Sequence, residues 1–144
     1  MALRDAGSRA SADSLMFAVL EAANTIAERL EDALATVGLS LAKYGVLAQL
    51  AEADSALALS ELADTQSCVR SNITQLVDRL EREGLVRRVD DPADRRIVRA
   101  ELTPAGEERQ REAARQVRRA ESEFLGALSD ADRRALERAL RALR

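Results

Sequence analysis

The sequence contains no histidine and no tryptophan, and it has one cysteine among 144 residues. Without histidine the chain lacks the usual general base and the commonest nitrogen ligand for zinc. Its one cysteine, Cys68, can form neither an intramolecular disulfide nor a cysteine-rich zinc site. Glycine-rich phosphate loops and nucleophilic serine motifs are also missing from the sequence. We therefore expect no catalytic residues, no metal and no cofactor, and predict that the protein is not an enzyme.

Long apolar segments are missing as well. No run approaches the ~20 residues that a membrane span requires, and the first residues contain no apolar core of signal-peptide length. We therefore expect a cytoplasmic protein with no membrane partner. The length of 144 residues, with 33% charged and 47% hydrophobic residues, suits one folded domain.

Positive charge is unevenly distributed along the chain. The formal net charge is −3, but the segment from Arg70 to Arg99 contains eight arginines and six acidic residues. Nearly all basic residues are arginines, since Lys43 is the only lysine. The planar guanidinium group suits phosphates and guanine edges, and it suits carboxylates equally well. A locally basic segment therefore lies within an acidic chain.

Apolar spacing predicts six helices and one short β-hairpin, a mainly α fold with a small β element (α+β). Residues 1–12 show no periodicity and are interpreted as a flexible tail. Alternating residues predict strands over 85–89 and 97–102, joined by a solvated connector. Helices are expected over 13–38, from Ser40 through Ala53, after an N-cap at Ser60, from Val69 to Glu83, from Pro104 to about Leu128, and after an N-cap at Ser129.

The span "SELADTQSCVRSNITQLVDRLEREGLVRR" combines a short helix, a turn and a longer helix, which is typical of a helix-turn-helix. The second helix of such a unit enters the DNA major groove. Arginine, asparagine and glutamine can each form two hydrogen bonds with a purine edge. A polar helix surface is ordinary by itself. The residues that this pattern places at the groove are Arg70, Ser71, Asn72 and Gln75, with Arg79 one turn later.

The hairpin that follows strengthens the interpretation. Arg95 and Arg96 lie at its expected tip, and a helix-turn-helix followed directly by such a hairpin is a winged helix. The wing can insert an arginine into the minor groove, where negative potential is concentrated.

From about Asp13 onward the chain resembles MarR-type transcriptional regulators. The resemblance is carried by "SELAD", "NITQLVDRLEREGLVRR" and above all "DPADRRIVRAELTPAG". It implies one domain over 13–144, with dimerisation helices over 13–38 and 104–144 and a winged helix-turn-helix over 39–103. It also implies a homodimeric repressor that binds double-stranded DNA at a pseudo-palindromic operator. A small ligand, often aromatic, or an oxidant would release the DNA.

The resemblance also assigns roles to single residues. Arg70, Ser71, Asn72 and Gln75 would face the groove, and Arg95 or Arg96 would be the wing arginine. Asp94 would hold that arginine in place through an ion pair.

Three interpretations stay open beside these. Cys68 is either a buried packing residue or a redox switch close to Arg70, whose charge would lower the thiol pKa. The aromatic residues Phe17, Tyr44 and Phe124 are interpreted as core residues rather than as the walls of a ligand pocket. The acidic helices also allow a winged-helix module that binds a protein instead of DNA.

Overall fold

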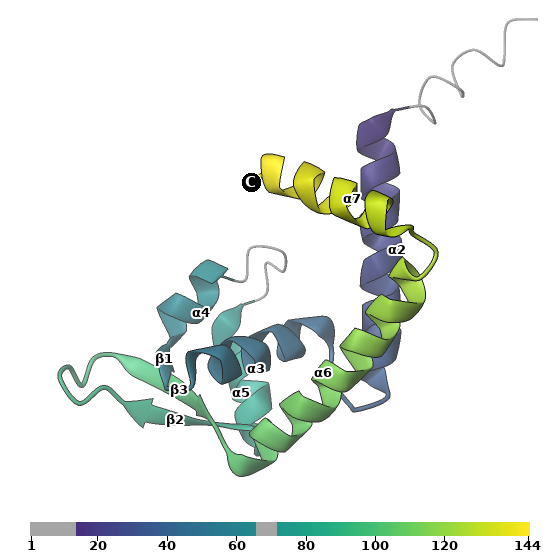
Figure 1. Cartoon of the computed structure of the whole chain (residues 1–144). Coiled ribbons are helices and arrows are strands. Elements are labelled where there is room, and N and C mark those ends of the chain that lie inside the picture. The colour runs from purple at the N-terminus through teal and green to yellow at the C-terminus, as the bar shows by residue number, and fades with distance from the viewer. Residues whose placement is uncertain (1–13, 66–71) are drawn as a thin grey trace, which may run out of the picture.

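The computed structural model describes residues 14–65 and 72–144, and it contains a winged helix attached to a pair of long helices. The predicted tail over 1–12 lies outside the described residues. Figure 1 shows the long helices α2 and α6 side by side, with α7 crossing beyond the end of α6. Their bounds are Leu15–Ala35 for α2, Pro104–Leu125 for α6 and Asp130–Ala142 for α7.

The compact part contains three helices and a small sheet. The helices are α3 (Leu41–Ala53), α4 (Leu59–Thr65) and α5 (Ile73–Arg82). The strands are β1 (Leu57–Ala58), β2 (Val86–Asp90) and β3 (Val98–Leu102), and all pairs are antiparallel in the order β1-β3-β2. The predicted mainly α fold with a small β element is therefore confirmed.

The core joins the compact part to the base of the long helices. Its largest fully buried side chains come from α2, α3, α4, α5 and β2, and they are Leu34, Val46, Leu47, Leu62, Val77, Leu80 and Val86. One face of α5 packs into this core, because its Leu76, Val77 and Leu80 are buried. Burying one large apolar side chain stabilises the folded chain by about 1.5–3 kcal/mol. This core therefore holds α5 against the sheet.

The sheet has three strands where the sequence predicts two. Strand β1 consists of two residues, and Leu57 pairs with Ala100 in β3. Helix α4 begins at Leu59, so the predicted N-cap at Ser60 is wrong, because Ser60 lies inside the helix. The Glu61 carboxylate instead accepts the Ala58 backbone N–H at 2.7 Å. A glutamate in the first turn that accepts a backbone N–H from the cap position stabilises a helix start.

The start of α6 agrees with the prediction. Thr103 is its N-cap, Pro104 is its first residue, and the Thr103 hydroxyl accepts the Gly106 N–H at 3.0 Å. The helix ends at Leu125, three residues before the predicted Leu128. Ser129 caps α7 by accepting the Asp132 N–H at 3.1 Å, which confirms the second predicted cap.

Large apolar side chains on α2 and α7 are exposed to solvent in the single chain. On α2 they are Leu15, Met16, Phe17, Val19, Leu20 and Ile26, on α7 they are Leu136 and Leu140, and Leu143 follows α7 directly. Phe17 is 57% exposed, so its assignment to the core is wrong. Tyr44 packs against the core as expected, and the buried environment raises its pKa. None of the described helices combines the length and apolarity needed to cross a membrane.

Candidate nucleic-acid interface

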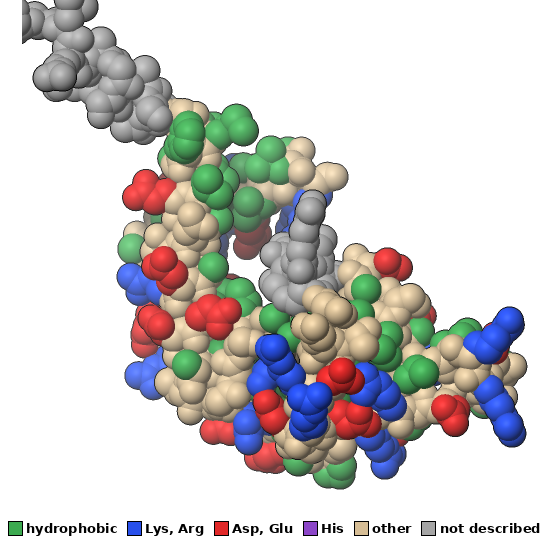
Figure 2. Space-filling model, turned by 180° about the vertical axis from the view of Figure 1, so that it is seen from behind, with side chains coloured by type: hydrophobic (Ala, Val, Ile, Leu, Met, Phe, Trp, Pro, Cys, Tyr) green, Lys and Arg blue, Asp and Glu red, His purple; other side chains and the backbone are tan. Residues whose placement is uncertain are grey.

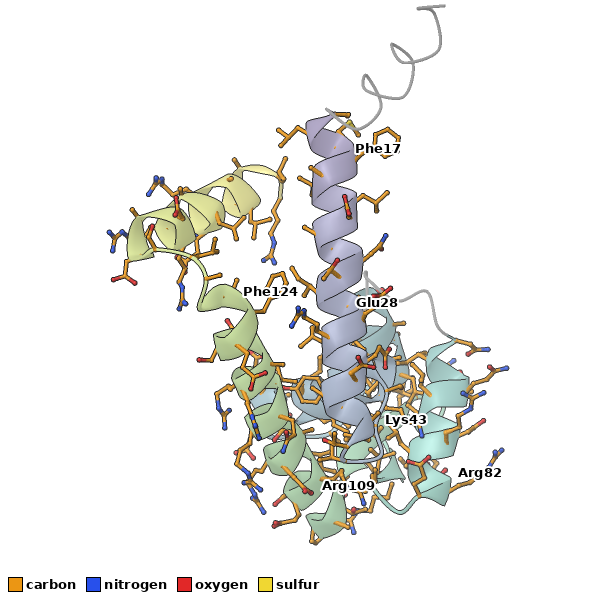
Figure 3. All side chains as sticks on the ribbon, turned by 90° about the vertical axis from the view of Figure 1, so that its right-hand side faces the viewer. Phe17, Glu28, Lys43, Arg82, Arg109 and Phe124 are labelled. Carbon is orange, nitrogen blue, oxygen red and sulfur yellow. The ribbon has the colours of Figure 1, made fainter. Side chains whose placement is uncertain are left out.

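Helix α5 presents one polar face to solvent. Its apolar face is buried, and the opposite side exposes Thr74, Gln75, Arg79 and Arg82. A shallow depression on this side is lined by Gln75, Asp78, Arg79 and Arg82, and Arg82 points away from the body of the molecule (Figure 3). The residues at positions 75, 79 and 82 are spaced by four and three, so they form one stripe along the helix.

Asn72 marks the start of α5 and is not part of the helix. Its φ of −59° and ψ of 107° are non-helical, and its Oδ1 accepts the Thr74 N–H at 3.1 Å. The predicted helix start at Val69 is therefore wrong, because asparagine prefers the N-cap position, where it satisfies an otherwise unpaired backbone N–H. Asn72 is exposed next to Thr74 at the end of the polar face. The predicted site residues Arg70 and Ser71, together with Cys68, lie outside the described residues.

Ion pairs hold α5 against its neighbours. Lys43 of α3 pairs with Glu83, which follows α5 directly. Arg88 of β2 pairs with both Asp78 and Glu81 of α5, and its hydrogen bond to Asp78 raises its pKa. One guanidinium that donates to two carboxylates fixes the geometry better than a single contact does. These pairs attach the polar helix to both α3 and the sheet.

The wing projects from the body, with basic side chains at its end (Figure 2). Arg95 and Arg96 are both exposed, and the Arg96 side chain is 90% exposed. Asp94 accepts the Arg96 Nε–H at 3.1 Å and the Arg96 Nη2–H at 3.0 Å. The hydrogen bonds from Arg96 lower the pKa of Asp94. An exposed pair contributes only ~0–1 kcal/mol, so its effect is to orient the arginine rather than to stabilise the fold.

Asp91 is buried, so the prediction of a fully solvated connector between the strands is wrong at this residue. It is 8% exposed, and its Oδ2 accepts the Arg99 Nε–H at 2.5 Å. Its Oδ1 accepts the N–H groups of Ala93 and Asp94 at 2.8 and 3.1 Å. The Asp-Pro dipeptide could have predicted a turn at this place, because an aspartate accepts backbone N–H groups two and three residues later. Its partner Arg99 could not be predicted from local sequence.

The arginines of the basic segment fall into two groups. Arg87, Arg88, Arg96 and Arg99 form ion pairs with carboxylates. Among the described residues, no side-chain partner is found for Arg79, Arg82 and Arg95, which are all exposed. The unpaired group offers guanidinium donors on α5 and at the wing tip. Arg82 is not among the residues predicted from the sequence, although its spacing from Gln75 and Arg79 places it on the same stripe of the helix.

The buried Asp91 carboxylate predicts an acid dependence of stability. The hydrogen bond from Arg99, helped by the Ala93 N–H, lowers the pKa of Asp91 below its ordinary 3.8. A lowered folded-state pKa stabilises the fold at pH values above the ordinary pKa, and this contribution is lost as the pH falls through the folded-state pKa. We expect Asp91→Asn, which keeps the Oδ1 acceptor, to be less stable than the parent at about pH 7, and this difference to be smaller at about pH 3, where the unfolded-state carboxyl is largely protonated. Urea unfolding at both pH values measures the difference, and a constant difference would contradict the assignment.

A group of three or more residues able to hold a metal ion is not found in the described part of the chain. The arrangement is instead a polar helix face beside a hairpin with an arginine tip, and comparison with known proteins identifies it. The model of the MarR family matches residues 39–98. A MarR family transcriptional regulator from Streptomyces coelicolor, solved in complex with DNA, is 30% identical, has a TM-score of 0.79, and is matched over 90% of this chain and 82% of its own. The chain belongs to the MarR family.

Two further comparisons give similar proteins. CouR from Rhodococcus jostii, solved with bound p-coumaroyl-CoA, is 26% identical over 92% of both chains, with a TM-score of 0.79. The regulatory protein for the hcr operon of Thauera aromatica is 35% identical over 101 residues, which are 70% of this chain and 60% of that protein. The chain spans less than two thirds of the length of the curated relatives that it matches.

Proposed function

We propose that the protein is a homodimeric repressor that binds a pseudo-palindromic operator with α5 in the major groove and the wing in the minor groove. The observation that carries the proposal is the division of the arginines. Those nearest the sheet are neutralised by carboxylates, whereas Arg79, Arg82 and Arg95 remain exposed on the face that would meet DNA. The related regulator from Streptomyces coelicolor was solved in complex with DNA.

In this proposal the residues of α5 and of the wing contact different parts of the DNA. Gln75 contacts a base edge near the start of α5, and Asn72 contributes its side-chain NH₂ because its Oδ1 caps the helix. Arg79 and Arg82 neutralise phosphates along the groove wall. Arg95 enters the minor groove, and Asp94 orients the adjacent Arg96. Arg70 and Ser71 keep their predicted groove-facing roles.

Dimerisation is supported by the exposed apolar residues of α2 and α7. A concavity between α2, α6 and α7 continues this surface. In its wall, the Arg29 Cζ atom lies over the Phe124 ring, 5.3 Å from the ring centre. Its walls are Ile26, Arg29, Leu30, Val117, Ala120, Glu121, Phe124, Leu125, Leu136 and Leu140. Monomeric proteins rarely expose a contiguous apolar surface of this kind. A second copy, which carries the same apolar helices, is the occupant that we propose.

Relief of repression by a small ligand or by an oxidant completes the proposal. A ligand is supported by CouR, which was solved with p-coumaroyl-CoA. The oxidant would act through Cys68. The alternative of a winged helix that binds only protein is less favoured, because it leaves the exposed arginines of α5 and the wing without a role.

We expect duplexes selected from random-sequence DNA to share a two-fold pattern, with half-sites about 10 base pairs or a multiple of that apart. Affinity measured by fluorescence anisotropy should fall steeply with salt, because bound phosphates release counterions. Arg82→Ala should lower the slope of log affinity against log salt by about 1 per protomer. Arg111→Ala is the matched control, since Arg111 is exposed on α6 and pairs with Glu108 of its own helix.

Selection without any enriched duplex would contradict the proposal and favour the protein-binding alternative. An unchanged salt slope in Arg82→Ala, with an operator still bound, would contradict only the role of Arg82.

A further inference from the structure

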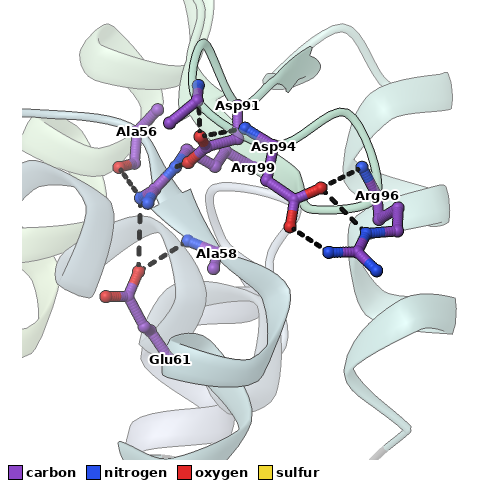
Figure 4. Close-up of polar contacts among 8 residues, drawn as sticks. Ala56, Ala58, Glu61, Asp91, Asp94, Arg96 and Arg99 are labelled. Carbon is purple, nitrogen blue, oxygen red and sulfur yellow. Dashed lines mark hydrogen bonds and ion pairs between the residues drawn. The ribbon is translucent and has the colours of Figure 1, made fainter.

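Arg99 connects the root of the wing to the first helix of the helix-turn-helix (Figure 4). Its Nε–H donates to Asp91 at 2.5 Å, and its Nη1–H donates to the Ala56 carbonyl at 3.3 Å. The same Nη1 lies 3.5 Å from Glu61 Oε2. Ala56 precedes Arg99 by 43 residues, so one guanidinium joins two parts of the winged helix that are distant in sequence.

The anchor on the α4 side is itself held in place. The Glu61 carboxylate accepts the Ala58 N–H at 2.7 Å at the start of α4. Ala58 pairs with Arg99 across the β1-β3 ladder. The guanidinium therefore meets backbone and carboxylate groups whose positions are set by the sheet and the helix.

The anchor on the wing side continues to the tip. Asp91 accepts the Asp94 N–H at 3.1 Å, and Asp94 in turn accepts the Arg96 N–H at 3.0 Å besides the two bonds from its guanidinium. Figure 4 shows these contacts as one connected series from Glu61 to Arg96. The tip arginine is therefore linked to α4 through hydrogen bonds and one ion pair outside the strand ladder.

The Asp91–Arg99 pair differs from the Arg87–Glu101 pair on the same hairpin. Arg87 pairs with Glu101 across β2 and β3, so both partners belong to the hairpin, and the Arg87 side chain is 65% exposed. Asp91 is buried, and the Arg99 side chain is 30% exposed. Removing one partner of a buried hydrogen-bonded pair leaves the other unsatisfied, which is more disruptive than the loss of an exposed pair.

We infer that Arg99 is a positioning residue for DNA binding, which holds the wing at a fixed angle to the helix-turn-helix so that the wing tip and α5 engage one duplex together. This inference rests on the proposed function, since the angle matters only if the wing contacts DNA. A two-stranded hairpin is marginally stable alone. A wing released from α4 must be ordered when DNA binds, and that ordering weakens affinity.

The first test needs no DNA. Hydrogen–deuterium exchange of the free protein should show several-fold faster exchange over residues 91–97 in Arg99→Gln, with α2 and α6 unchanged. Arg87→Gln is the matched control and should exchange like the parent. Arg99→Lys keeps the charge, but its ammonium cannot reach Asp91, Ala56 and Glu61 together, so intermediate exchange is expected. Parent-like exchange in Arg99→Gln or in Arg99→Lys would overturn the inference.

The second test is a double-mutant cycle on a duplex selected by the parent protein. Arg99→Gln and Arg95→Ala should each weaken binding about tenfold, and the double variant should lose clearly less than the product of the two. Multiplied losses would show that Arg99 acts independently of the wing tip and would overturn the inference. Absence of any selected duplex for the parent would instead overturn the proposed function, and the exchange experiment would still report on the link itself.

Discussion

Replacing Gly106 with alanine should lower the free energy of unfolding by about 3 kcal/mol or more. A Cβ atom at this position would lie 1.9 Å from the Leu85 carbonyl oxygen and 3.3 Å from Leu102 Cδ2. The closer contact is with backbone, so no side-chain rotation relieves it. The start of α6 would have to move away from the segment that joins α5 to the sheet.

Such a movement would break further contacts at the same place. The Thr103 N–H donates to the Leu85 carbonyl at 3.1 Å, and the Thr103 hydroxyl donates to the Gly84 carbonyl at 2.6 Å. These bonds attach the first turn of α6 to the segment that follows α5. The substitution therefore disturbs the junction between the long helices and the winged helix, not only one glycine.

Urea and thermal unfolding at a fixed protomer concentration measure the effect, which corresponds to a fall in Tm of about 6–12 °C. Gly84→Ala is the matched control. Gly84 has a φ of +73° and no neighbour within 4 Å of a built Cβ, so only the left-handed backbone is penalised, by about 1 kcal/mol. Equal and small losses in the two variants would refute the steric account of Gly106.

Gly106 also illustrates what the sequence could predict of the fold. Thr103 and Pro104 predict the helix start from local chemistry, and the structure confirms it. The need for glycine three residues after the cap arises from a backbone that approaches from Leu85, so no local pattern reveals it. Strand β1 was not predicted for a similar reason. Its two residues are too few to show an alternating period, and they pair only with the distant β3.

The candidate interface was predictable in part. The exposed face with Gln75 and Arg79 follows from helical spacing against the buried Leu76, Val77 and Leu80. The start of the helix was misplaced because Asn72 suits both a cap and a groove-facing position, and local sequence does not decide between them. Which arginines are paired was also beyond prediction, since Arg88 and Arg99 find partners 10 and 8 residues away through the sheet geometry.

Replacing Leu140 with glutamate should convert the proposed dimer to monomers. Leu140 is 48% exposed in the single chain and lines the concavity together with Leu136, Ile26 and Phe124. If a second copy fills this surface, the new carboxylate is buried without a partner, at a cost of several kcal/mol. Sedimentation equilibrium should then show the monomer mass at micromolar concentration.

DNA binding should fall with the dimer. A monomer presents one α5 and one wing, so it contacts one half-site and loses the gain from linking two sites, which is about 10²–10⁴-fold. Arg138→Glu is the matched control, because it places the same side chain on α7 outside the walls of the concavity. Arg138→Glu also changes the net charge by more than Leu140→Glu does. If general charge repulsion from DNA were the cause, Arg138→Glu would therefore lose more DNA affinity than Leu140→Glu.

The two readouts separate the parts of this prediction. A dimeric Leu140→Glu variant with parent-like affinity would mean that another surface joins the copies. A monomeric variant that still binds its selected duplex tightly would mean that one winged helix suffices, and the two-fold pattern expected of the operator would then have no physical basis. Loss of both properties, with the control intact, would tie operator recognition to the apolar surface of α2 and α7, because only the linked pair of α5 helices can span both half-sites.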